Sequence, residues 1–131
     1  MQRIQPVTRN AQQTFSSWYN EARRVAAGNG YAQDAVSASL IWSMSLDVHV
    51  QQNYRSQCLL GTACEITTTG LSFRCRESLS IYHVITLCRA GELEGIKAKI
   101  VDKKETIGGF VYEVRCEAER VERKAGTVAA A

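Results

Sequence analysis

The chain has 131 residues, of which 45% are hydrophobic and 22% are charged, with nine glycines and one proline. This size and balance fit one globular domain and exclude a disordered chain. No apolar run approaches the roughly 18 residues that a membrane helix needs, and residues 1–6 lack the apolar core of a secretory signal, so we expect a cytoplasmic protein. The net charge of +3 comes from 16 basic and 13 acidic residues that are interspersed, which argues against a nucleic-acid-binding role.

The cysteines point to reduced thiols. There are five of them, an odd number, and only two histidines accompany them. No pair forms a C-x-x-C motif, and structural zinc sites usually have closely paired ligands. The sequence therefore predicts thiols that pack as small hydrophobic side chains, and it predicts no metal site and no cofactor.

Residues 10–27 have the pattern of an amphipathic helix. A capping-box pattern starts it, apolar side chains recur at helical spacing, and residues 28–30 contain two glycines that end it. The apolar face carries Phe15, Trp18 and Tyr19. We expect this face to pack on the rest of the domain, because apolar helix stripes mostly face the chain's own core. The alternative is that these aromatic side chains bind a protein partner.

Residues 36–50 alternate between apolar and polar side chains. Every even position is apolar and the odd positions are mostly polar, with Ile41 as the exception. A period of two predicts a long strand with one buried face, bent or broken near Ile41. The polar face carries a Ser-His-Asp combination: Ser43, Ser45, Asp47 and His49. Same-face neighbours on a strand lie about 6.8 Å apart, too far for a proton relay, so we expect a solvated face and no enzyme.

Shorter strands are expected further along the chain, at residues 57–66, 71–75, 82–89, 94–103 and 109–118. Gly91 and the glycine pair at 108–109 mark hairpin turns. Six strands at this spacing predict a mainly β protein with a small antiparallel β-barrel, since closure removes exposed sheet edges.

The expected organisation has three parts. The N-terminal helix and turn occupy residues 1–30, the barrel occupies 31–120, and a tail occupies 121–131. Residues 117–124 are in addition a candidate short C-terminal helix.

The turn between the second and third strands stands apart. Glu65 ends a strand, Thr67 follows two residues later, Gly70 comes three after that, and an apolar strand then begins. A carboxylate can accept hydrogen bonds from a nucleobase edge, a hydroxyl can donate one to a phosphate, and a glycine permits a tight turn with positive φ. The same residues also suit an ordinary hairpin in which Thr67 caps its own turn.

This turn resembles the D/N-x-S-x-x-G hairpin of PilZ domains. The long first strand, the basic strand at 96–101 and the closing strand at 109–114 are also similar to that family. The resemblance implies a six-stranded barrel that binds the bacterial second messenger cyclic di-GMP and controls motility, pili or exopolysaccharide synthesis through a protein partner. It places Glu65 on a guanine and Thr67 beside a phosphate, with Gly70 fixing the turn.

The sequence departs from the family upstream of the first strand. PilZ domains have an R-x-x-x-R segment there, whose guanidiniums hold phosphates and stack on guanines, and this chain contains no R-x-x-x-R. Losing two charge-assisted contacts at ~1.5–3 kcal/mol each lowers the affinity by about three decades. We therefore expect an atypical PilZ-like module with weak or lost nucleotide binding that acts through protein contacts.

Two alternatives remain at this level. One is a true cyclic di-GMP receptor in which Arg23, Arg24 or Arg55 replaces the missing arginines. The other, less favoured, is a small barrel that binds single-stranded nucleic acid, which requires exposed aromatic side chains beside a basic groove.

Overall fold

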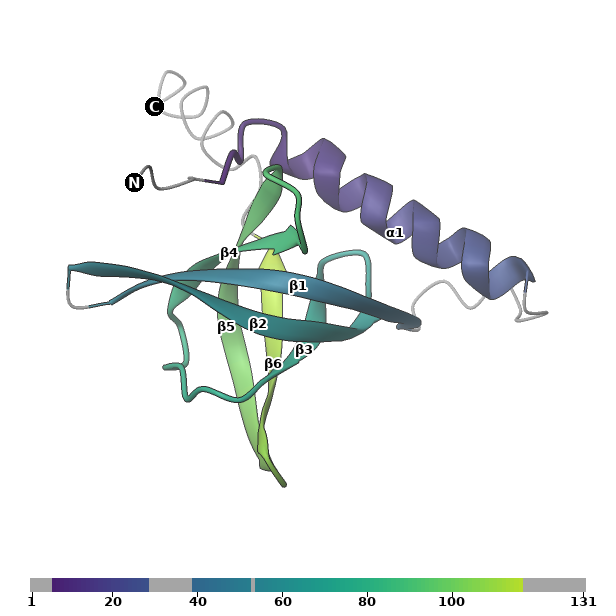
Figure 1. Ribbon diagram of the computed structural model, residues 1–131. Coiled ribbons are helices and arrows are strands. Elements are labelled where there is room, and N and C mark those ends of the chain that lie inside the picture. Colours follow the sequence, from purple (N-terminus) through teal and green to yellow (C-terminus); the bar gives the residue numbers. More distant parts are fainter. Residues whose placement is uncertain (1–5, 29–38, 53, 117–131) are drawn as a thin grey trace, which may run out of the picture.

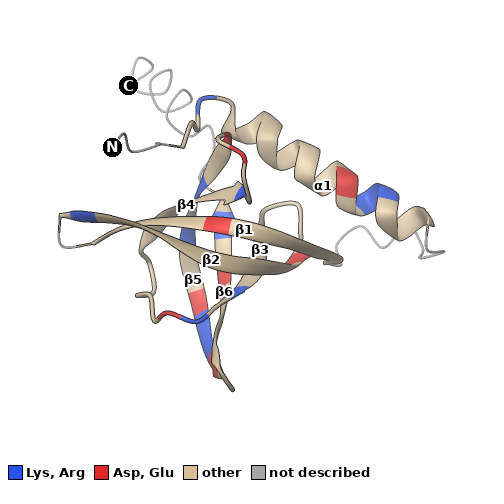
Figure 2. Ribbon diagram, viewed as in Figure 1, with Lys and Arg blue, Asp and Glu red and all other residues tan. Residues whose placement is uncertain are grey.

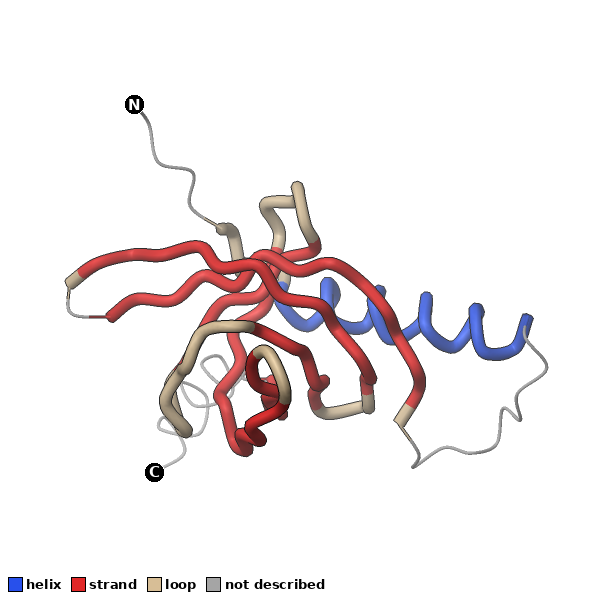
Figure 3. Tube along the Cα trace, turned by 60° about the horizontal axis from the view of Figure 1, so that its bottom comes forward, coloured by secondary structure: helices blue, strands red, loops and turns tan. Residues whose placement is uncertain are grey.

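One helix and six strands make up the computed structural model, which describes residues 6–28, 39–52 and 54–116. The elements are α1 (Ala11–Gly28), β1 (Leu40–Gln52), β2 (Arg55–Ile66), β3 (Gly70–Cys75), β4 (Val84–Arg89), β5 (Gly95–Thr106) and β6 (Gly109–Cys116). The strands pair antiparallel and close in the order β1-β2-β3-β6-β5-β4 (Figures 1 and 3). The predicted fold class, a six-stranded antiparallel barrel with an N-terminal helix, is therefore confirmed. The candidate helix at 117–124 lies outside the described residues.

The alternation of β1 is visible in its burial. The even-numbered residues Trp42, Leu46, Val48 and Val50 are buried. The register between β1 and β2 shifts between Ile41 and Met44, and Ile41 is 68% exposed. An irregularity of this kind bends the strand, as predicted near Ile41, and Ile41 itself stays on the exposed face together with the neighbouring odd positions.

Two of the turns depend on glycine conformations. Gly91, between β4 and β5, has φ of +85°, and Gly108, between β5 and β6, has φ of +87°. Side chains with a Cβ rarely adopt these values, so both positions act as the predicted hairpin turns.

A buried tyrosine fixes the long connection from β3 to β4. The Tyr112 hydroxyl donates a hydrogen bond to the Glu77 carbonyl at 2.6 Å and accepts one from the Leu79 backbone N–H at 2.7 Å. Its ring packs beside that of Phe73, with ring centroids 5.4 Å apart. Because the hydroxyl has partners for both of its roles, the ring can be fully buried without leaving a polar group unsatisfied.

Helix α1 lies along the barrel and contacts β1 and β5 (Figure 1). Phe15, Trp18 and Ala22 belong to the same buried cluster as the barrel core, and the indole ring of Trp18 stacks on that of Trp42 with centroids 5.4 Å apart. Phe15 and Trp18 therefore pack on the chain's own domain, as the sequence predicts. These two aromatic side chains are unavailable to a partner while the helix is docked, and Tyr19 is half-buried beside them.

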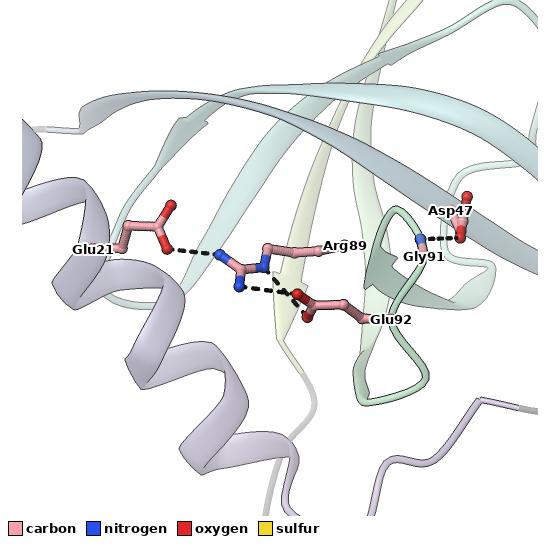
Figure 4. A network of polar contacts seen from close by, with 5 residues as sticks. All are labelled: Glu21, Asp47, Arg89, Gly91 and Glu92. Carbon is pink, nitrogen blue, oxygen red and sulfur yellow. Dashed lines mark hydrogen bonds and ion pairs between the residues drawn. The ribbon is translucent and has the colours of Figure 1, made fainter.

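Ion pairs link helix α1 to the end of β4 and to the turn that follows it. The Arg89 guanidinium contacts the Glu21 carboxylate at 2.6 Å and the Glu92 carboxylate at 3.0 Å (Figure 4). The hydrogen bonds to Glu92 raise the pKa of Arg89, and that to Glu21 adds to the effect.

Within the described part of the chain, no helix has both the length and the apolar character that crossing a membrane requires.

Candidate functional site

The turn after β2 is held by Thr67 itself. The Thr67 hydroxyl oxygen accepts hydrogen bonds from the backbone N–H of Thr69 at 3.2 Å and of Gly70 at 3.1 Å, and the hydroxyl donates to the Gly70 carbonyl at 3.2 Å. The Thr67 backbone N–H donates to the same carbonyl at 2.8 Å. Of the two interpretations of this turn, the geometry matches the one in which Thr67 caps its own hairpin.

Gly70 has a different role from the predicted one. It is the first residue of β3, it pairs with Arg115 on β6, and the described glycines with positive φ are Gly91 and Gly108. A Cβ at position 70 would lie 1.9 Å from the Val114 carbonyl oxygen. The expectation of a turn conformation with positive φ was therefore wrong, and glycine is required here because β3 and β6 approach closely.

A pocket opens beside this turn. It has a volume of about 320 Å³, and its lining includes Glu65, Thr67, Glu113 and Arg115. Two carboxylates and one guanidinium thus face the space where the PilZ resemblance places the nucleotide. Ser39 also lines it, at the point where β1 begins.

Arg115 is a pocket residue that sequence reasoning missed. It pairs across the strands with Gly70, and this register brings it to the pocket although it lies 45 positions further along the chain. The signal was present in part, because Arg115 falls on the polar face of the predicted last strand. The sequence does not indicate that β6 pairs with β3 in the closed barrel.

The three predicted arginines lie elsewhere. Arg55 begins β2 and Glu65 nearly ends it, so ten residues of extended strand separate them by roughly 33 Å. Arg23 and Arg24 are exposed on α1, and Arg24 shares its surface with Gln12 and Ser16, on the polar face of the helix. None of the three is among the described lining residues of the pocket, so the structure does not bring them together with Glu65, Thr67 and Gly70.

The surface charges of the described residues do not gather by sign. Figure 2 shows basic and acidic residues interspersed over the barrel strands. Arg74 and Arg76 lie on or next to β3, while Glu65 and Glu113 lie on the strands to either side of it. An alternation of this kind gives little attraction for a polyanion.

The cysteines divide into two groups. Cys75 and Cys88 are buried, and burial raises the pKa of each thiol to about 11. Cys116 is partly buried, and desolvation raises its pKa to about 12. These three thiols are the inert packing groups that the sequence predicts. Cys64, on β2, is half-buried as well. Cys58 differs from the other four because it is exposed on β2, so the prediction of a packed thiol is wrong for this residue.

Comparison with known proteins gives no assignment. No protein-family model matches the chain, and a search of curated proteins finds no match. The PilZ resemblance therefore stays a prediction made from the turn and the strand pattern.

Proposed function

We propose that this protein is a non-enzymatic, PilZ-like binding module in bacterial cyclic di-GMP signalling, with weak or lost nucleotide binding, that acts through a protein partner in motility, pilus or exopolysaccharide control. The observation that carries this proposal is the charge of the pocket at residues 65–70. It presents Glu65, Glu113 and Arg115 to a ligand with two phosphates. Such a ligand needs guanidinium groups that outnumber the carboxylates, and the pocket has the opposite balance.

The Thr67 hydroxyl supports the same conclusion. Its proton is directed at the Gly70 carbonyl and its oxygen accepts from two backbone N–H groups. A phosphate oxygen would have to displace the bond to Gly70. One hydrogen bond would then replace another, and the net gain from such an exchange is small.

Calorimetric titration of the full chain with cyclic di-GMP tests the nucleotide part of the proposal. We expect no saturable heat at ligand concentrations up to about 1 mM, where the binding free energy would be only about −4 kcal/mol. Micromolar or tighter binding would contradict the proposal.

Removing the like charges makes the test sharper. The double variant Glu65→Asn, Glu113→Gln keeps hydrogen-bonding side chains and removes both carboxylates from the pocket. We expect it to bind cyclic di-GMP at least about tenfold more tightly than the wild type, because two repulsions of about 1 kcal/mol each disappear. Glu105→Gln, which removes an exposed carboxylate of β5 that does not line the pocket, is the matched control and should leave cyclic di-GMP binding unchanged.

A second candidate function is a true cyclic di-GMP receptor, and the position of Arg115 favours it. Arg115 is an arginine that lines the pocket, so it is the residue here best placed to contact a phosphate. If the wild type binds with micromolar affinity, Arg115→Ala should abolish binding. Arg55→Ala, at the far end of β2, should leave it unchanged.

The protein partner is tested separately. The tagged full chain is purified from bacterial cells with and without added cyclic di-GMP. A module that acts without the nucleotide should retain the same partner under both conditions. A partner retained only with the nucleotide would support the receptor function instead.

A further inference from the structure

Three side chains with metal-binding atoms meet on the outer face of β1 and β2. Asp47 and His49 are two residues apart on β1, so they point to the same side of the sheet. Cys58 on β2 is paired directly with His49 in the strand register. One carboxylate oxygen, one imidazole nitrogen and the thiol sulfur all lie within 4.8 Å of one another.

These distances are close to those of an occupied site. Around a tetrahedral zinc ion, ligand atoms at about 2.0–2.3 Å from the metal lie roughly 3.3–3.8 Å apart. The three atoms therefore need to approach by at most roughly 1–1.5 Å, a distance within the reach of small changes in the side-chain χ angles. Carboxylate, imidazole and thiolate are the ligand types that zinc uses in proteins, and the thiolate disfavours magnesium and calcium.

The surroundings of Asp47 orient its carboxylate. The backbone N–H of Gly91 donates a hydrogen bond to Asp47 Oδ2 at 3.3 Å (Figure 4). Gly91 holds this position through the tight β4–β5 turn, in which its φ is +85°. Metal-binding carboxylates are commonly fixed by such outer contacts, which leave the other oxygen free for the metal.

There is also room for a fourth ligand. A pocket of about 390 Å³ adjoins the cluster, and His49, Cys58, Thr86 and Lys97 are among its lining residues. Three protein ligands with one open position are the arrangement of zinc sites that bind water or an external ligand, whereas purely structural sites have four protein ligands.

We propose that Asp47, His49 and Cys58 bind one Zn²⁺ ion, with its fourth coordination position open to the adjoining pocket. The metal displaces the proton of the Cys58 thiol, which passes to solvent as the sulfur–zinc bond forms. This site is independent of the proposed nucleotide-binding function. The sequence argument against a metal relied on the absence of C-x-x-C spacing, and it did not anticipate that a strand register pairs His49 with Cys58.

The test uses the full chain, freed of metal with a chelator under reducing conditions. Zinc is titrated in competition with a chromogenic chelator, and we expect one equivalent to bind. Loading with Co²⁺ should produce a thiolate-to-cobalt charge-transfer band in the near ultraviolet. At a free zinc concentration of about 100 times Kd, the unfolding midpoint should rise on the order of 10 °C, because the metal binds only the folded chain.

Variants separate this site from other zinc binding. Cys58→Ser should remove the charge-transfer band, and Cys58→Ser and His49→Ala should each weaken zinc binding by at least about 100-fold. Asp47→Asn keeps an acceptor for the Gly91 N–H and loses the charge, so it should fold normally and bind zinc more weakly.

Cys64→Ser and His83→Ala are the matched controls, since they remove the same residue types from outside the cluster. Both should bind zinc as the wild type does. Three results would each overturn the proposal: no stoichiometric zinc binding, zinc binding that survives Cys58→Ser and His49→Ala, or equal losses in the controls.

Discussion

Single residues of the β2–β3 turn are explained better by packing than by ligand binding. Gly70 lies against the Val114 carbonyl, and the Thr67 hydroxyl is hydrogen-bonded to the backbone of the turn. The two positions that most resemble a nucleotide-binding motif thus have structural reasons for their residue types. The fold itself can therefore account for the residues of the turn motif. The R-x-x-x-R arginines, which this chain lacks, would be needed only to bind a ligand.

Gly70→Ala should destabilise the protein severely. A Cβ 1.9 Å from a backbone oxygen can be accommodated only if β3 and β6 move apart, and overpacking of this kind costs about 1–3 kcal/mol or more. Equilibrium unfolding in denaturant measures the effect as a lower midpoint. Gly28→Ala is the control, since a Cβ there meets nothing within 4 Å, and it should change stability by less than about 1 kcal/mol. Equal stabilities of the two variants would contradict the close approach.

Thr67→Val should weaken the turn, and Thr67→Ser should restore it. Valine has the shape of threonine but leaves the backbone N–H groups of Thr69 and Gly70 without their acceptor. We expect a loss of about 1 kcal/mol, kept small because the turn is partly exposed to water. The midpoint of denaturant unfolding measures this loss. If valine and serine behave alike, the hydroxyl does not hold the turn.

At the scale of elements, the positions of the strands could largely be predicted from the sequence, but the pairing between strands could not. All six strands were predicted to within a few residues from the alternation over β1 and β6 and from the turn glycines at 91 and 108. Both signals depend only on residues that are close together in the sequence. The candidate site depends on register. Arg115 reaches the pocket only because β6 pairs with β3, two strands far apart in the sequence. Cys58 reaches His49 through the register of the β1–β2 hairpin, which depends on the exact length of the turn and not on alternation alone.

Helix α1 should be stabilised chiefly by its buried aromatic face. Trp18 is 2% exposed and stacks on Trp42, so Trp18→Ala should cost about 3–5 kcal/mol. Val25 also lies on α1 but is 53% exposed, and Val25→Ala should stay within about 0.5 kcal/mol of the wild type. Thermal or denaturant unfolding distinguishes the two. A Trp18→Ala variant as stable as the wild type would place the helix face outside the core.

At the scale of the whole molecule, the two candidate sites are well separated. Cys58 and Glu65 both lie on β2, seven residues apart, which corresponds to about 23 Å of extended strand. Groups at this distance that share no partners act independently. A change in the zinc cluster should therefore leave any nucleotide response of the turn unaltered, and a change in the pocket should leave zinc binding unaltered.

The helix and the barrel should unfold together. Trp18 from α1 and Trp42 from β1 share one buried cluster, so each element loses apolar contacts when the other unfolds. Far-ultraviolet circular dichroism, which reports on the helix, and tryptophan fluorescence, which reports on the stacked pair, should give the same midpoint and slope in denaturant. In Trp18→Ala, whose helix has lost its largest buried side chain, the helix signal should fall before the remaining tryptophan responds. Separate transitions in the wild type would show that α1 is a detachable element, and its aromatic face would then become accessible to a partner.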